Sequence, residues 1–159
     1  MTFWNSHKIE PMRKRAFKVS LGGDDKISFL AKTVNKPTLE TDVNEYKLIN
    51  QVKKFPSIPK WNEITIKYVD TKSQKITKKL MTLMMTSGNT PNSSWTADAI
   101  TKGDVKLIIE QLDAGGKPSS TWSFKNPFIR SINFGDLDYS SDEFVEIDVV
   151  VSYDWAYLT

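Results

Sequence analysis

The sequence contains no cysteine and only one histidine, His7, among its 159 residues. Without cysteine, a disulfide framework, a thiolate zinc site, an iron–sulfur cluster and a cysteine nucleophile are all excluded. A single histidine also argues against a multi-histidine metal site or a histidine-based catalytic triad within one chain. We therefore expect no catalytic residues, no metal and no cofactor, and we do not expect an enzyme.

Long apolar runs are missing as well. No stretch approaches the roughly 18 consecutive apolar residues that a membrane-spanning helix needs. The N-terminal residues, which include Phe3 and Trp4, lack the apolar core of a secretory signal. We therefore expect no membrane partner and an intracellular, reducing compartment. The length is typical of one domain, so residues 1–159 are treated as a single domain.

The two halves of the chain differ in charge. Residues 1–80 contain 17 Lys or Arg against 8 Asp or Glu, whereas residues 81–159 contain 5 against 11. This asymmetry has three interpretations. The basic half could bind nucleic acid, or copies of the chain could associate head to tail through opposite charges. Alternatively, the two halves interleave in the fold and the asymmetry has no consequence.

Alternation of apolar and polar residues dominates the sequence and predicts a mainly β fold. Residues 17–21 alternate cleanly and residues 26–34 less so. The Gly22-Gly-Asp-Asp25 segment between them has turn chemistry, so these residues predict an N-terminal hairpin. Further strands are expected at 61–70, at 104–113, and, after a turn at Gly115-Gly116, at 120–125 and 128–134.

The longest alternating segment lies near the C-terminus, at 143–155. Thirteen residues would make an unusually long strand, since five or six is typical. Its apolar set should face the core, because exposing large apolar side chains costs roughly 1.5–3 kcal/mol each. The core-facing set is Val145, Ile147, Val149, Val151, Tyr153 and Trp155; the opposite face carries Glu146, Asp148, Val150 and Ser152.

A flanking helix is expected at 73–88. Ser73 can cap it, Gly88 can end it, and Ile76, Leu80, Leu83 and Met84 fall on one face. This apolar stripe is most simply core packing. Residues 94–102 are compatible with a short second helix that ends at Gly103.

The segment 36–60 stands apart because it is polar and contains three prolines. It predicts a long extended arm or long hairpin that packs against something outside its own fold. A solvated loop is the alternative, although structureless loops of this length are uncommon in compact domains. The arm offers four apolar anchors for a neighbouring subunit: Tyr46, Leu48, Ile49 and Phe55.

Short motifs also occur in a characteristic order along nearly the whole chain. They run from Trp4-Asn-Ser-His-Lys-Ile-Glu-Pro-Met-Arg13 through Ala31-Lys-Thr-Val-Asn-Lys-Pro37 and Trp61-Asn-Glu-Ile-Thr-Ile-Lys-Tyr-Val-Asp70 to Phe134-Gly-Asp-Leu-Asp-Tyr139 and Tyr153-Asp-Trp-Ala156. In this order the sequence resembles the tail tube proteins of contractile-tailed bacteriophages. It departs from the family pattern at Ser57, where glycine is expected after Phe55-Pro56.

The resemblance implies an antiparallel β-sandwich or barrel with a flanking helix, a fold shared with the type VI secretion tube protein. It also implies homohexameric rings that stack into a tube, whose lumen conducts the viral genome during injection. The implied partners are further copies of the chain, the tail sheath, the baseplate and passing double-stranded DNA that is not specifically bound. The implied location is the virion tail, after assembly in the host cytoplasm.

Two alternatives stay open. A tube initiator or terminator would have the same fold. From another functional class, a small β-rich nucleic-acid-binding protein would use the basic N-terminal half, where Arg13, Lys14 and Arg15 cluster near Phe3 and Trp4.

The resemblance and the residue patterns together predict two further sites. If the ring geometry of the family holds, the face with Glu146, Asp148, Val150 and Ser152 lines the lumen, and its carboxylates repel DNA phosphates. The charge asymmetry predicts a contact between copies that joins a basic set to an acidic set. The residues of this charged interface are Arg13, Lys14, Arg15, Lys53 and Lys54 on one copy, and Asp136, Asp138, Asp142 and Glu143 on the other.

Overall fold

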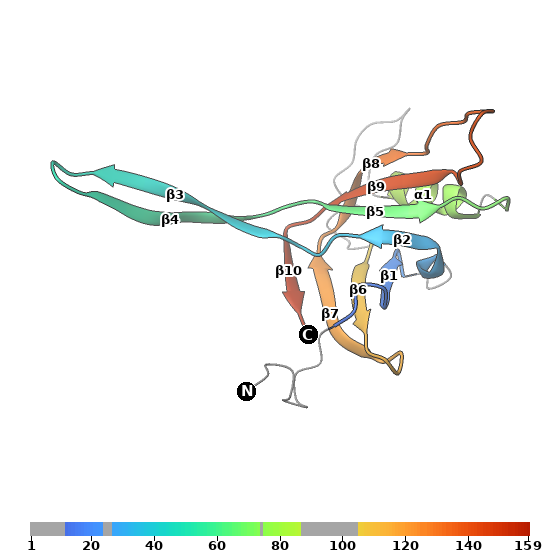
Figure 1. The fold of residues 1–159 in the computed structure, drawn as a ribbon, viewed down its shortest axis with the longest axis horizontal. Coiled ribbons are helices and arrows are strands. Elements are labelled where there is room, and N and C mark those ends of the chain that lie inside the picture. Colours follow the sequence, from blue (N-terminus) through green and yellow to red (C-terminus); the bar gives the residue numbers. More distant parts are fainter. Residues whose placement is uncertain (1–11, 24–26, 74, 87–104) are drawn as a thin grey trace.

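The structure is a computed structural model that describes residues 12–23, 27–73, 75–86 and 105–159. Antiparallel strands account for most of it, together with one α-helix and a short 3-10 helix (Figure 1). In chain order the elements are β1 (Phe17–Leu21), η2 (Ser28–Leu30), β2 (Ala31–Val34), β3 (Leu39–Lys47), β4 (Val52–Trp61), β5 (Ile64–Val69), α1 (Lys75–Thr86), β6 (Leu107–Leu112), β7 (Pro118–Lys125), β8 (Phe128–Asn133), β9 (Glu146–Ser152) and β10 (Trp155–Leu158).

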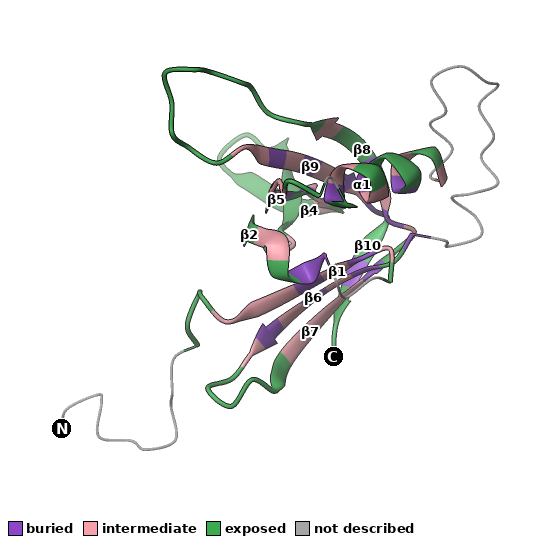
Figure 2. Ribbon diagram, turned by 90° about the vertical axis from the view of Figure 1, so that its right-hand side faces the viewer, coloured by how far each residue is buried: buried purple, intermediate pink, exposed green. Residues whose placement is uncertain are grey.

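Two four-stranded sheets form a sandwich. One, the β6–β7 sheet, has the order β1-β6-β7-β10; the other, the β5–β9 sheet, has the order β2-β5-β9-β8. Figure 2 shows the first below and the second above, with buried residues between them. Neither sheet closes into a barrel among the described strands. The expected fold class, a mainly β antiparallel sandwich with one flanking helix and a long arm, is confirmed.

The core follows from period-2 alternation in the paired strands. Ile64, Ile66 and Tyr68 of β5 are fully buried, and so are the apolar residues of β9 that pair with them. A strand that is apolar on one face can bury that face only against a second layer, which the β6–β7 sheet provides. The strands predicted at 61–70, 104–113, 120–125 and 128–134 are therefore confirmed, with shorter bounds for some of them.

Helix α1 covers an open side of the sandwich (Figure 2). Its stripe of Ile76, Leu80 and Leu83 is buried in the shared core. Gly22, at the end of β1, allows the close approach: its φ is +71°, and a Cβ there would lie 2.5 Å from Leu83 Cδ2. The predicted helix is confirmed over 75–86. Its proposed ends near Ser73 and Gly88 and the short helix at 94–102 involve residues outside the described part.

The segment expected to be an arm is a two-stranded hairpin. β3 and β4 pair from Leu39↔Trp61 to Lys47↔Val52. The hairpin, hereafter the arm, projects along the long axis away from the sandwich (Figure 1). None of its residues is buried; only Ser57 and Trp61 reach intermediate exposure. Cross-strand hydrogen bonds therefore define the arm, but the core of its own chain does not support it.

The predicted N-terminal hairpin is wrong. β1 pairs with β6 in one sheet, whereas β2 pairs with β5 in the other. Residues 28–30 form the short 3-10 helix η2, and only 31–34 are extended. The chain crosses between the sheets here because this crossing lets β1 and β2 each bury an apolar face in the common core.

The predicted strand at 143–155 is also too long. β9 ends at Ser152, and after a bend at Asp154 the chain continues as β10 in the other sheet. Trp155, expected in the core, is half exposed, and Val145 is only partly buried. Tyr153 fixes the bend: its ring packs 4.8 Å from that of Phe124, and its hydroxyl donates a 2.7 Å hydrogen bond to the Asn62 carbonyl.

In the part of the chain that the structure describes, α1 is too short and too polar to cross a bilayer, and no longer apolar helix is found.

Candidate functional site

The outer face of the β5–β9 sheet contains the four residues predicted to line a lumen. Glu146, Asp148, Val150 and Ser152 alternate with the buried side of β9, and all four are partly exposed. The adjacent β5 adds Thr65 opposite Val150 and Lys67 opposite Asp148. We call these six residues the polar wall. The structure thus places the predicted residues on one continuous, solvent-facing surface.

Lysines compensate the carboxylates of the polar wall. Lys67 Nζ lies 3.8 Å from Glu146 Oε2 and 3.5 Å from Asp148 Oδ1. Lys32, on β2, pairs with the other oxygen of Glu146. The hydrogen bond from Lys32 lowers the pKa of Glu146, and that of Lys32 is correspondingly raised. The sequence analysis identified Glu146 and Asp148 but missed both lysines. Alternation in β5 predicts the face on which Lys67 lies, but it does not predict which residue of β9 lies opposite.

The same sheet ends in two edge strands. Among the described strands, β2 pairs only with β5 and β8 pairs only with β9, so β2 and β8 are the edge strands of this sheet. Exposed edges with free N–H and C=O groups are templates for pairing with another chain. The β5–β9 sheet can therefore be extended at both ends.

The four predicted anchors of the arm are exposed in the single chain. Tyr46, Leu48 and Phe55 are about half exposed, and Ile49 is fully exposed. In the register of the hairpin, Tyr46 lies opposite Lys53 on one face. The next pair, Lys47 and Val52, lies on the other face. Apolar side chains thus occur on both faces of the hairpin, a distribution that a free solvated hairpin does not need.

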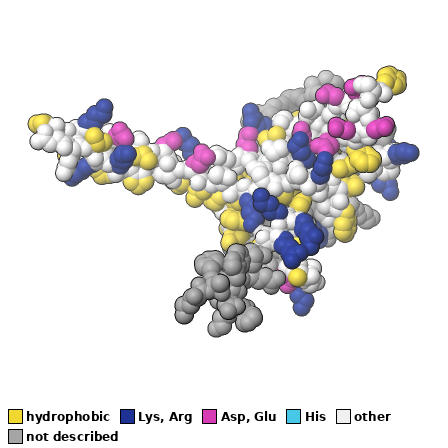
Figure 3. Space-filling view, in the orientation of Figure 1, with side chains coloured by type: hydrophobic (Ala, Val, Ile, Leu, Met, Phe, Trp, Pro, Cys, Tyr) yellow, Lys and Arg dark blue, Asp and Glu magenta, His cyan; other side chains and the backbone are white. Residues whose placement is uncertain are grey.

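The residues of the predicted charged interface occupy three separate places. Arg13, Lys14 and Arg15 precede β1, whereas Lys53 and Lys54 lie on the arm. The acids lie in the β8–β9 loop, residues 134–145. On the face shown in Figure 3, Asp and Glu gather at the end of the molecule that carries this loop. The structure therefore does not bring the basic set together into one surface; it brings together the acidic set: Asp136, Asp138, Asp142 and Glu143.

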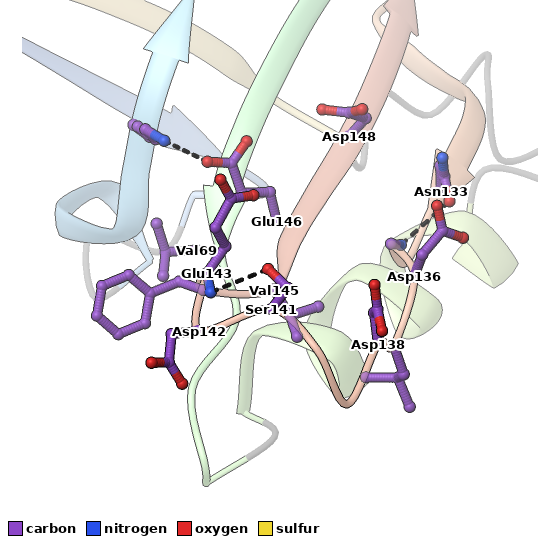
Figure 4. A pocket seen from close by; sticks show the side chains of 14 residues that line it. Val69, Asn133, Asp136, Asp138, Ser141, Asp142, Glu143, Val145, Glu146 and Asp148 are labelled. Atoms are coloured by element: carbon purple, nitrogen blue, oxygen red, sulfur yellow. Dashed lines mark hydrogen bonds and ion pairs between the residues drawn. The ribbon is translucent and has the colours of Figure 1, made fainter.

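The β8–β9 loop encloses a hollow of about 860 Å³ between itself, β2, β5 and β9. We call it the loop hollow (Figure 4). Its lining is mixed: the four loop acids and the wall carboxylates alternate with apolar side chains, among them Val69, Leu137, Phe144 and Val145. Gly135 shapes the start of the loop, since its φ is +82° and a Cβ there would lie 2.6 Å from the Glu146 carbonyl oxygen.

Among the loop acids, Asp138 is held by local hydrogen bonds. The backbone N–H and the hydroxyl of Ser140 both donate to Asp138, and the backbone bond is the main reason that the pKa of this carboxyl is lowered. Within the described residues, no group of three or more His, Cys, Asp or Glu is arranged to hold a metal ion.

Comparison with protein families gives one match. The model of the family described as T4-like virus tail tube protein gp19 matches residues 13–155. A comparison with curated proteins found no significant sequence match.

Solved structures with the same fold include chains of a contractile injection system and a type six secretion system protein. A chain of the structure of the PVC sheath/tube terminator, from an extracellular contractile injection system, is 15% identical, with a TM-score of 0.73, over 96% of this chain and 99% of that one. A chain of the PVC sheath-tube complex is 16% identical, with a TM-score of 0.69, over 94% and 91%. A type six secretion system protein is 8% identical, with a TM-score of 0.53, over 89% and 81%. At these identities the likeness establishes the fold.

Proposed function

The chain belongs to the T4-like virus tail tube protein gp19 family, and on this premise we propose that it is the repeating subunit of a tail tube, closing into six-membered rings that stack head to tail. The observation that carries this proposal is the β5–β9 sheet, which is open at both edges and has a polar outer face. Its role is structural rather than catalytic.

Ring closure follows from the two edge strands, β2 and β8. The β8 edge of one copy can pair with the β2 edge of the next, so that the sheets of neighbouring copies join into one cylinder. Closure removes every exposed edge of this sheet, which is the general advantage of barrels over open sheets. The β6–β7 sheet then lies outside the cylinder, and the polar wall lines its lumen.

The composition of the polar wall suits a conduit for double-stranded DNA. A strongly basic wall would bind phosphates with a salt-dependent affinity and slow their passage. Here Lys32 and Lys67 are held by Glu146 and Asp148, so their charges are compensated within the wall. DNA passing within a Debye length, about 8 Å at physiological salt, would meet a polar surface without uncompensated cations at these positions.

The outside of the tube would face the tail sheath, and its ends would meet the baseplate and a terminator. The similar chain in the PVC sheath-tube complex supports this arrangement. The protein would reside in the virion tail after assembly in the host cytoplasm. A terminator or initiator role is the second candidate, since a chain of the PVC sheath/tube terminator structure shares the fold over nearly the full length of both chains.

Electron microscopy of the purified protein at high concentration tests the proposal. We expect rings with sixfold symmetry and tubes made of stacked rings. A terminator or initiator would give single rings that do not lengthen. A monomer that shifts on DNA with a steep salt dependence would instead support a nucleic-acid-binding protein and overturn the tube proposal.

A further inference from the structure

The tip of the arm has no role in its own chain. Leu48 and Gln51 close the turn by two backbone hydrogen bonds of 2.7 and 3.4 Å, which leaves Ile49 and Asn50 at the apex. Neither residue has a positive φ, so this turn does not require Asn, Asp or Gly at its apex. Ile49 is a large apolar residue there, and it is fully exposed. The turn permits such a side chain but does not need it, and an exposed apolar apex is suited to insertion into a partner.

The tip is also basic. Three lysines and one glutamate lie between residues 45 and 54. Lys54 pairs with Glu45 at 3.6 Å. Lys47 and Lys53 have no ion-pair partner among the described residues, so the apolar apex is flanked by cations without compensating charges.

The loop hollow is apolar and acidic, which complements the apolar and basic arm tip. Leu137 and Phe144 line it, although both are largely exposed in the single chain. The β8–β9 loop that encloses it carries four acids and no lysine or arginine. Six carboxylates and one lysine, Lys32, line the hollow, and Lys32 is paired with Glu146. Apolar side chains without cover among mostly acidic groups are typical of a contact surface for a partner with the opposite charge.

The two features lie at opposite ends of the molecule. The arm extends from one end of the long axis and the β8–β9 loop from the other (Figure 1). They therefore cannot meet within one chain. If one copy follows another along this axis, the tip of the first reaches the hollow of the second, and the contact repeats without closing on itself, as heterologous head-to-tail interfaces do.

We propose that the loop hollow of one subunit is the receptor for the arm tip of a second copy of this chain, with Ile49 seated against Leu137 and Phe144, and Lys47 and Lys53 facing the loop acids. This inference rests on the proposed tube, and it names the two surfaces that join successive rings.

The absence of cysteine makes a direct test possible. In the double variant Ile49→Cys with Leu137→Cys, every subunit has one thiol at the arm tip and one in the loop hollow. A disulfide forms only when the two Cα atoms come within about 4.4–6.8 Å. After mild oxidation of assembled protein we expect a ladder of covalent multimers on a non-reducing gel, with positions 49 and 137 linked in the peptide digest. Each single variant should give no more than dimers.

The matched control is Ile49→Cys with Tyr157→Cys, since Tyr157 is a half-exposed aromatic residue on the other sheet. It should give no ladder. If tubes form but positions 49 and 137 do not cross-link, or if position 49 links to its own counterpart, the receptor is wrong and the tube proposal survives. If the wild-type chain forms neither rings nor tubes, both proposals fail.

A second variant gives a readout without cysteine. Ile49→Asp should leave the thermal unfolding of the single chain unchanged, because Ile49 packs against nothing there. It should raise the protein concentration needed for tube formation at least tenfold, because an acid would enter an acidic hollow. Tube formation by this variant at the wild-type concentration would overturn the inference.

Discussion

Lys32 and Glu146 show how single contacts set the charge of the polar wall. The lysine hydrogen bond lowers the pKa of Glu146, so the carboxylate stays ionised to a lower pH than usual. Its favourable contribution is complete above the ordinary carboxyl pKa and is lost as the pH falls through the lowered value. The pKa of Lys32 is raised, so on the alkaline side the stabilising contribution of the pair is lost only as the pH rises through this raised value. The pair is therefore intact throughout the neutral range.

We predict that Lys32→Met raises the pKa of Glu146 toward its ordinary value, because the main source of the shift is removed while Lys67 remains. Carboxyl titration followed by NMR measures this change. Asp138 provides an internal control, since hydrogen bonds from Ser140 lower its pKa without Lys32. An unchanged Glu146 titration would show that Lys32 does not control the wall carboxylate.

The arm is the element whose removal separates folding from assembly. Replacing residues 42–58 by Asn-Gly joins the paired residues Thr41 and Pro59 through a two-residue turn. No buried residue is lost, so the variant should fold with a near-normal thermal midpoint. We predict that it forms no tubes, because the contact between successive rings is gone.

Circular dichroism and electron microscopy together check this prediction. Normal tubes from the shortened chain would show that the arm is dispensable for stacking. Loss of the folded signal would show that the arm supports its own sandwich, contrary to its lack of buried residues.

At the scale of elements, the sequence predicted best where one face of a strand is fully buried. The alternation of Ile64, Ile66 and Tyr68 identified β5 and its faces, and the spacing of Ile76, Leu80 and Leu83 identified α1. In both cases the local period reflects the burial of one face directly. The polar, proline-containing composition of 36–60 likewise indicated a segment outside the core.

The errors arose where pairing over long distances decided the outcome. Residues 17–34 contain two alternating runs and a good turn, but the partners of the strands, β6 and β5, lie far along the chain. Alternation also continues past Ser152 through Tyr153, so nothing in the local pattern marks the bend. The ion pairs of Lys67 with Glu146 and Asp148 depend on the register of β5 against β9. This register cannot be predicted from the alternation of the two strands.

At the scale of the whole molecule, the ion pairs of the polar wall predict the effect of reversing the charge of its two acids. In the double variant Glu146→Lys with Asp148→Lys, the two new lysines would join Lys32 and Lys67 on one face, and the proposed sixfold symmetry would repeat them around the lumen. We predict that tubes still assemble, because these side chains do not pack in the core and the four loop acids proposed to face the arm lysines are unchanged. DNA delivery should slow, because the wall now attracts phosphates. Delivery assays on particles built with the variant measure the effect.

The matched control is Glu110→Lys, which removes an acid from β6 in the sheet that faces away from the proposed lumen. It should deliver DNA normally. Unimpaired delivery by the double variant, or equal impairment by the control, would contradict a lumenal position of the polar wall.

The unsupported arm also has a consequence for the timing of growth. An isolated two-stranded hairpin is at best marginally stable in water, so a free subunit keeps much of the conformational entropy of residues 39–61 until the arm binds. Two free subunits that meet must order one arm for a single contact, whereas a subunit that joins an existing tube also pairs its sheet edges with ring neighbours. We therefore expect a lag before spontaneous tube formation, and its abolition by pre-formed fragments. Slow nucleation of this kind keeps subunits soluble until a template starts the tube.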